Sequence, residues 1–135
     1  MQEPSIFTRI INGEIPAQKI YEDDKVIAIL DIHPMTPGHA LVIPKVQIDS
    51  LWDLDDALYT YVMEIVKKVA TRQQEVLNPN RVGMTLDGFS VPHAHVHVFP
   101  LYEGLESTLV KHIDRESRPV NSDELDDMAK KLHFS

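Results

Sequence analysis

The sequence predicts an α+β fold in which a five-stranded antiparallel sheet is accompanied by one long helix and short helices near both termini. Three observations lead to this prediction: five short segments have strand character, one long segment has helical periodicity, and few βαβ units are present. We expect the 135 residues to form a single domain spanning 1–135. Its core would lie at about residues 5–101, followed by a carboxy-terminal extension with a short helix at 121–132.

The first half of the chain is expected to hold one short helix and three strands. Apolar residues at helical spacing predict a helix that begins near Ile6 and ends at Asn12-Gly13, a pair typical of helix ends. Pro34 and Gly38 belong to a predicted tight loop. The strands are expected at residues 19–22, 26–31 and 40–44. Because the second of them is almost wholly apolar, we expect it to be buried on both faces.

The second half contains the long helix and the remaining strands. Apolar residues from Leu54 to Val76 recur at steps of three and four, which predicts a helix with one buried face. Asp53 is the expected cap at its start, and Asn78 lies at its end. A short terminal helix should begin after Asn121, whose side chain can cap it. Strands are expected at residues 81–86 and 91–100.

Composition and charge exclude several classes of function. The content of 43% hydrophobic and 25% charged residues is ordinary for a folded domain. No apolar run approaches the length of a membrane span, so we expect no membrane partner. The formal net charge of −8 argues against nucleic acid as a partner, because nucleic-acid binding needs a basic surface. The sequence has no cysteine, which is compatible with a cytoplasmic location.

The strongest chemical signal is a tract with three histidines at a spacing of two. His93, His95 and His97 alternate with small or β-branched residues, and this period is that of a β-strand. The spacing therefore predicts three imidazoles on one face of the strand at 91–100. Imidazole can act as a nucleophile, an acid–base catalyst or a metal ligand near neutral pH.

A metal site is the serious alternative for this tract. At about 3.3 Å per residue, the two outer histidines are about 13 Å apart along the backbone, whereas zinc needs its nitrogen ligands at about 2.0–2.1 Å. Three imidazoles in line cannot easily reach one ion, and the sequence offers no cysteine and no HExxH segment. We therefore expect neither a metal nor another cofactor, and we favour a nucleophile between two groups that hold an anion.

The histidine tract resembles the signature of the histidine triad (HIT) family, His-φ-His-φ-His-φ-φ with apolar φ, at residues 93–99. Two further segments, at residues 7–17 and 30–45, resemble the amino-terminal segment and the nucleotide-binding hairpin of the same family. The three segments follow the order of the family and cover most of residues 5–101. This resemblance implies a HIT-like fold and a homodimer that pairs through the sheet and the long helix.

The resemblance also implies a reaction. His95 would attack the α-phosphorus of a nucleotide and form a covalent nucleotidyl-histidine that water then hydrolyses. His97 and His39 would donate hydrogen bonds to the phosphate oxygens, and His93 would fix the tautomer of His95 through its backbone carbonyl. The implied activity is that of a nucleotide hydrolase or transferase acting on adenosine phosphoramidates or dinucleoside polyphosphates.

A nucleoside pocket is implied as well, with an apolar lining and a carboxylate for the ribose hydroxyls. The residues that the resemblance places at the substrate are Phe7, Ile10, Ile29, Asp31, Ile32, Gly88, Phe89 and Ser90. The sequence departs from many relatives at Gln47, where they carry histidine, and at Phe89, where they carry glutamine. Their frequent asparagine on the preceding strand is replaced by Val82 or Gly83. These departures put the identity of the substrate in doubt, but not the nucleophile.

Two other hypotheses stay open at this point. One is a nucleotide-sensing or scaffold dimer with weak catalysis, which the departures at Phe89 and at the missing amides would favour. The other is a metal-dependent hydrolase, which a strong chelator would inactivate.

Overall fold

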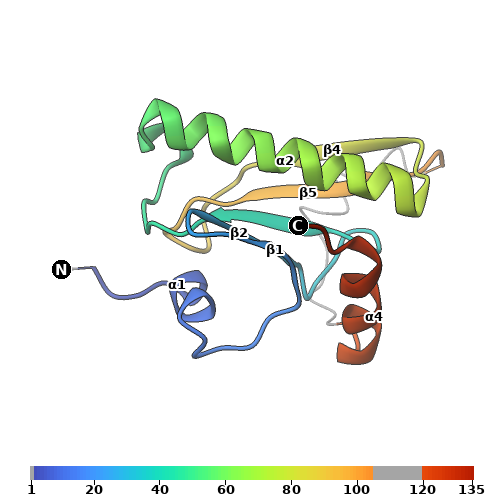
Figure 1. Ribbon diagram of the computed structural model, residues 1–135, viewed down its shortest axis with the longest axis horizontal. Coiled ribbons are helices and arrows are strands. Elements are labelled where there is room, and N and C mark those ends of the chain that lie inside the picture. Colours follow the sequence, from blue (N-terminus) through green and yellow to red (C-terminus); the bar gives the residue numbers. More distant parts are fainter. Residues whose placement is uncertain (1, 105–119) are drawn as a thin grey trace.

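The sheet is five-stranded and antiparallel, as predicted, with the spatial order β1-β2-β3-β5-β4 (Figure 1). A computed structural model of the protein describes residues 2–104 and 120–135. The strands are β1 (Lys19–Glu22), β2 (Val26–Leu30), β3 (Ala40–Pro44), β4 (Arg81–Thr85) and β5 (Val96–Leu101). The helices are α1 (Ile6–Ile11), the 3₁₀ helix η1 (Leu51–Asp53), α2 (Asp56–Leu77) and α4 (Ser122–Leu132). The α+β prediction is confirmed.

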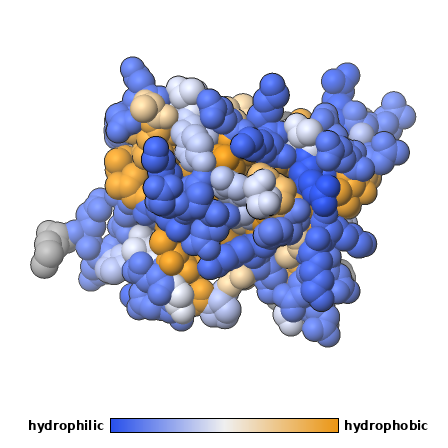
Figure 2. Space-filling model, in the orientation of Figure 1, coloured by the Kyte–Doolittle hydropathy of each residue, from blue (hydrophilic) through white to orange (hydrophobic). Residues whose placement is uncertain are grey.

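The sheet carries a hydrophobic core on each face. On one face α2 packs over the sheet, as Figure 1 shows, and its Val62, Ile65 and Val69 meet side chains from β2, β3 and β5. On the other face α1 contributes Phe7 and Ile10, which pack against the alternate residues of β2 and β3. All five residues of β2 are buried, which confirms the expectation for that strand. Hydrophilic residues predominate on the face of the molecule that Figure 2 shows, with smaller hydrophobic areas between them.

The long helix begins later than predicted. Leu54 follows η1 in an extended conformation, and the cap of α2 is Asp55, whose side chain accepts a hydrogen bond from the Leu58 N–H at 2.8 Å. The prediction of Asp53 as the cap is therefore wrong, because Ser50 starts a separate turn that uses Asp53. At the other end the prediction is confirmed, since Asn78 adopts the left-handed conformation that ends a helix.

The strand predicted at 91–100 is wrong in its first half, because β5 begins only at Val96. Pro92 cannot donate to a sheet ladder, and the next N–H, that of His93, closes a turn on the carbonyl of Val91 at 2.9 Å. His93 and His95 therefore precede the strand, and only His97 lies within it. The three imidazoles do not share one strand face.

The carboxy-terminal helix is confirmed, and the Asn121 side chain accepts a hydrogen bond from the Asp123 N–H at 2.7 Å. Leu125, Ala129 and Leu132 are buried. The earlier part of the predicted extension, residues 105–119, lies outside the described residues. No helix within residues 2–104 or 120–135 combines the length and hydrophobicity that a membrane crossing requires.

An acidic turn joins β1 and β2 and is tied by two tyrosines. The hydroxyls of Tyr21 and Tyr61 both donate to the carboxylate of Asp23, and the backbone N–H groups of Lys25 and Val26 do the same. Burial acts to raise the pKa of Asp23, but these hydrogen bonds outweigh it and lower the pKa to about 2. The turn therefore depends on an ionised carboxylate.

Candidate active site

His39 and His97 come from neighbouring strands and form a buried pair. His97 lies on β5 opposite Leu41 of β3, and both side chains face α1. His39 precedes β3 directly, and its Nε2 lies 2.9 Å from Nδ1 of His97. The structure thus brings together two of the histidines that the sequence singled out, although they are 58 residues apart.

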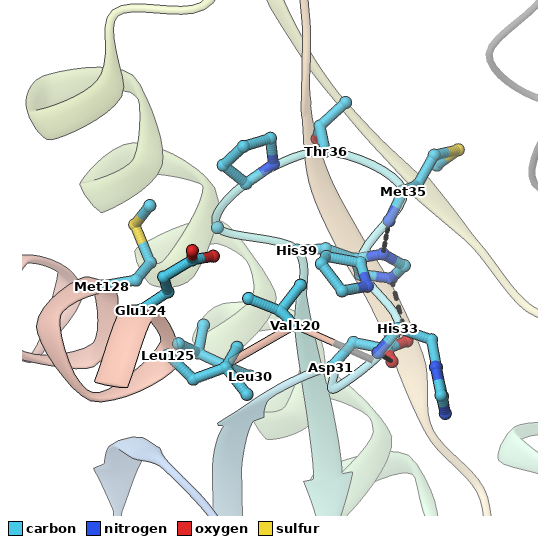
Figure 3. A pocket seen from close by; sticks show the side chains of 13 residues that line it. Leu30, Asp31, His33, Met35, Thr36, His39, Val120, Glu124, Leu125 and Met128 are labelled. Atoms are coloured by element: carbon cyan, nitrogen blue, oxygen red, sulfur yellow. Dashed lines mark hydrogen bonds and ion pairs between the residues drawn. The ribbon is translucent and has the colours of Figure 1, made fainter. Parts of the chain in front are cut away.

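The backbone fixes where the protons of this pair lie. The Met35 N–H donates to Nδ1 of His39 at 3.0 Å, as Figure 3 shows, so that nitrogen must be an acceptor. A neutral His39 then carries its proton on Nε2 and donates it to Nδ1 of His97. His97 in turn carries its own proton on Nε2. Each imidazole is therefore held in a defined tautomer.

Asp31 lies beside both imidazoles of the pair. One oxygen of its carboxylate, Oδ2, is 3.6 Å from Nε2 of His39 and 3.8 Å from Nδ1 of His97. The other, Oδ1, accepts a hydrogen bond from the His33 N–H at 2.8 Å. Asp31 therefore contacts the histidines in addition to lining the cavity, a contact that the sequence analysis did not foresee.

The imidazole of His95 is oriented by a hydrogen bond to the main chain two residues earlier. Its Nδ1 lies 2.7 Å from the backbone carbonyl of His93, which can only accept, so Nδ1 carries the proton. Nε2 of a neutral His95 then retains its lone pair. The ring packs edge-on against Phe7 at 4.9 Å between centroids and lies 5.2 Å from the ring of His97. This geometry is that expected for a nucleophilic imidazole.

His93 is completely buried behind His95. Its Nε2 donates to the Pro44 carbonyl at 2.8 Å, so its Nδ1 accepts the hydroxyl proton of Ser5 at 2.7 Å. Burial lowers the pKa of His93, the Pro44 carbonyl acts to raise it, and neighbouring His95 lowers it further. The net decrease favours the neutral form near pH 7.

Gln47 ties the amino-terminal segment to this site. Its Oε1 accepts from the Ser5 N–H at 2.8 Å and from the Thr8 hydroxyl at 2.7 Å, while its Nε2 donates to the Glu3 carbonyl. The sequence analysis noted Gln47 only as a departure from relatives, and it missed Ser5 and Thr8. A serine directly before an apolar helical segment is a cap signal that could have indicated Ser5.

A cavity of about 390 Å³ opens beside the histidines. Its lining is apolar at α1 and β2 and includes six polar residues: Asp31, His33, Asp87, Ser90, His95 and His97. The predicted residues that line it are Phe7, Ile10, Ile29, Asp31, Ile32, Ser90, His95 and His97. Gly88 lines a smaller hollow next to His95, and Phe89 does not reach the cavity because its side chain is 98% exposed. The structure therefore does not bring Phe89, which the resemblance placed at the substrate, into this cavity.

A second cavity, also of about 390 Å³, lies on the other side of the loop that carries His39. In Figure 3 its wall is formed by this loop, with Met35 and Thr36, and by α4, with Leu125 and Met128. Nothing in the sequence analysis indicated it.

Two groups of side chains in the described part of the chain could hold a metal ion: Asp31–His39–His97 and Asp87–His95–His97. In the first, the two bonded nitrogens are 2.9 Å apart, whereas two nitrogens on one tetrahedral zinc are about 3.3 Å apart. An ion there would have to replace the shared proton and separate the rings. In the second group Nε2 of His95 keeps its lone pair, but His97 would have to lose the proton on its Nε2 to bind an ion.

Comparisons with known proteins identify the family. The model of the HIT domain matches residues 12–104, which is more than half of the chain. Protein hit of Bacillus subtilis (strain 168) is 38% identical over 122 residues, which cover 83% of both chains. A Hit-like protein involved in cell-cycle regulation from Bartonella henselae, crystallised with an unknown ligand, has a TM-score of 0.86 at 32% identity. That match covers 97% of this chain and 95% of the other.

A second solved structure is that of a Zn-bound histidine triad family protein from Mycobacterium smegmatis. It has a TM-score of 0.76 at 28% identity and covers 94% of this chain and 88% of the other. The sequence match, the shared fold and the paired histidines agree. The chain therefore belongs to the histidine triad (HIT) family, and this membership supports the general class of nucleotide-binding hydrolases or transferases.

Proposed function

We propose that the protein hydrolyses or transfers nucleotides at the α-phosphate, through a covalent nucleotidyl-histidine on His95. The proposed substrates are adenosine phosphoramidates or dinucleoside polyphosphates. The observation that carries the proposal is the hydrogen bond of 2.7 Å from Nδ1 of His95 to the His93 carbonyl, which leaves Nε2 as the nucleophilic nitrogen in the cavity.

The proposed reaction has two displacements. In the first, Nε2 of His95 bonds to the α-phosphorus while the bond from phosphorus to the leaving group breaks, the leaving group takes a proton from solvent, and the Nε2–H of His97 donates a hydrogen bond to a phosphate oxygen. In the second, water replaces His95 on phosphorus and releases its proton to solvent, while His97 keeps the same hydrogen bond. His39 supports both steps, because its Nε2–H holds Nδ1 of His97 as an acceptor at 2.9 Å.

The apolar end of the cavity is the proposed site of the nucleoside. Phe7, Ile10 and Ile29 offer a surface for a base, and the carboxylate of Asp31 can accept hydrogen bonds from ribose hydroxyls, as carboxylates do in dinucleotide sites. Ser90 also lines the cavity, and its hydroxyl is the proposed donor to a phosphate oxygen. The formal charge of −8 makes local donors necessary, since the overall field repels a phosphate.

The direct test is incubation of the protein with a panel of nucleotide phosphoramidates and polyphosphates, followed by measurement of AMP release and mass spectrometry of His95. Turnover with labelled His95 is expected, and His95→Ala should abolish both. His133→Ala is the matched control, because that histidine is exposed at the end of α4. Full activity of His95→Ala would refute the proposal. Tight AMP binding without turnover by the unmodified protein would instead favour the sensor or scaffold function.

A metal-dependent hydrolase is the second candidate, because the relative from Mycobacterium smegmatis binds zinc and Asp87, His95 and His97 could hold an ion here. The two candidates make opposite demands on His95, since a bound ion would occupy the lone pair that the covalent route needs. Loss of turnover in a strong chelator would support the metal.

We also propose a homodimer that pairs through β4. This strand is at the edge of the sheet, and Met84 on it and Leu86 after it are exposed beside Trp52, which is 71% exposed. An uncovered edge strand with apolar side chains is a site for pairing with a second chain. Light scattering should show a dimer that Met84→Lys dissociates, while Val46→Lys, at another exposed apolar residue, leaves it intact.

A cytoplasmic location is proposed from the absence of cysteine and is tested by cell fractionation.

A further inference from the structure

One side chain of α2 joins the two backbone segments that carry His39 and His97. Gln73 is fully buried, and its Nε2 donates to the Gly38 carbonyl at 2.9 Å and to the Val98 carbonyl at 3.0 Å. Gly38 directly precedes His39, and Val98 directly follows His97. A single amide group thus binds the main chain next to each histidine of the pair.

The ladder between β3 and β5 stops at this point. Its last pair is Ala40 with Val98. Two residues after Val98 on β5 comes Pro100, which has no N–H to donate. Beyond the last pair, side chains replace the ladder: Gln73 bridges two carbonyls, and the Thr36 hydroxyl donates to the Pro100 carbonyl at 2.6 Å. Figure 3 shows Thr36 on the same loop as His39. These side-chain hydrogen bonds join the loop to β5 beside His39.

The chemistry of the bridge requires an amide. Both partners are carbonyl oxygens that only accept, so the residue between them must supply two N–H donors without a charge, and only asparagine and glutamine do this from one nitrogen. The same constraint fixes the orientation of the amide, since a flipped Gln73 would turn its oxygen toward two other oxygens.

Gln73 occupies a position where an apolar residue would be expected. It follows Val62, Ile65, Val66 and Val69 on the buried face of α2. Its Oε1 is buried and has no hydrogen-bond partner among the described residues. An apolar side chain would avoid that unpaired oxygen, so the two donated hydrogen bonds are the property that distinguishes glutamine here.

We propose that Gln73 is a positioning residue, which sets the separation of His39 and His97 and thereby the direction of the hydrogen bond between them. Two carbonyls held by one nitrogen fix the two backbones relative to each other, and the side chains that leave them meet at 2.9 Å. Without the bridge the rings separate, His97 loses the donor that defines its tautomer, and its Nε2 is no longer protonated in every molecule. The catalytic consequence depends on the proposed function, but the effect on the tautomers does not.

The test compares Gln73→Met with Val62→Ala. Methionine keeps the volume and removes both donors, whereas Val62→Ala is a matched loss of packing on the same buried face of α2, away from the bridge. For Gln73→Met we expect kcat per folded molecule to fall about ten- to a hundredfold with KM changed less than about twofold. Val62→Ala should lower the thermal midpoint but keep kcat. Equal kcat in the two variants would overturn the proposal.

Nitrogen NMR of the imidazoles gives a readout that does not need turnover. In the unmodified protein His39 and His97 should both appear as Nε2–H tautomers, and the Gln73 side-chain amide protons should exchange slowly and couple to the Gly38 and Val98 carbonyl carbons. Gln73→Met should give mixed tautomers at both histidines. Unchanged tautomers, or a rapidly exchanging Gln73 amide in the unmodified protein, would refute the positioning role. Lack of turnover in the unmodified protein would refute only the proposed function.

Discussion

Ser5→Ala should destabilise the protein and disturb the nucleophile at the same time. Ser5 caps α1 by accepting from the Thr8 N–H at 3.0 Å, and its hydroxyl donates to Nδ1 of buried His93 at 2.7 Å. Loss of a serine cap costs about 0.5–2 kcal/mol. Leaving a buried acceptor unpaired costs about 1–3 kcal/mol more. The Thr8 hydroxyl is 3.4 Å from the same nitrogen, but its one proton is donated to Oε1 of Gln47, so it does not replace the lost bond and we expect about 2–4 kcal/mol in total.

Ser50→Ala provides the matched control. Ser50 caps η1 by accepting from the Trp52 N–H at 3.3 Å, so its loss removes a cap alone. Urea denaturation of both variants gives the free energy of unfolding, and the difference between them measures the bond to His93. Ser5→Ala should also slow the labelling of His95, because the carbonyl that holds His95 belongs to His93. If the two variants differ by less than about 0.5 kcal/mol, the reasoning is refuted.

Three further perturbations follow from the same structure. Because the pKa of Asp23 is lowered in the folded protein, its ionised carboxylate stabilises the fold above pH 3.8, and this stabilisation is lost as the pH falls through about 2. Asp23→Asn should therefore lower the free energy of unfolding by about 1–2 kcal/mol at pH 7, after allowance for partial exposure. In chemical denaturation at pH 2 the same substitution should change it by almost nothing. Gly38 has a φ of +94°, and a Cβ there would lie 2.5 Å from Leu77 Cδ1. Gly38→Ala should therefore lower the free energy of unfolding by about 1–3 kcal/mol, and an unchanged value would show that alanine is not strained at this position. Added zinc should inhibit turnover by occupying Nε2 of His95, and Asp87→Asn should relieve the inhibition in a zinc titration; activation by zinc would instead support the metal-dependent candidate.

Local patterns in the sequence were enough to predict the sheet, and the family resemblance added one local bond of the candidate site. An all-apolar β2 could only be a strand buried on both faces, and the spacing of apolar residues located α2. The bond from His95 to the His93 carbonyl was expected from the resemblance, and it spans two residues. Interactions of this kind depend on neighbours in the chain, so sequence is a sufficient guide to them.

What the sequence did not reveal depends on residues that are far apart. Gln47 and Ser5 form a hydrogen bond although they are 42 positions apart in the sequence, and Gln73 and Gly38 do so although they are 35 positions apart. Helical spacing marked Gln73 as a core position but could not name the two carbonyls that pair with its amide. The late start of β5 was missed because the alternation of His93 and its neighbours suits a strand, while Pro92 ends the ladder there.

Hydrogen bonds with the main chain define the tautomers of the neutral histidines in the site, although the carboxylate of Asp31 lies beside two of them. Backbone groups set three of the tautomers: the Met35 N–H can only donate to His39, and the carbonyls of Pro44 and His93 can only accept from His93 and His95. The fourth, that of His97, follows from His39 through the bond of 2.9 Å. Since main-chain N–H and C=O groups do not titrate near neutral pH, a neutral site has one arrangement of protons, with the lone pair on Nε2 of His95 and a donor on Nε2 of His97. A nucleophile and a hydrogen-bond donor of the same residue type can therefore stand side by side in opposite roles.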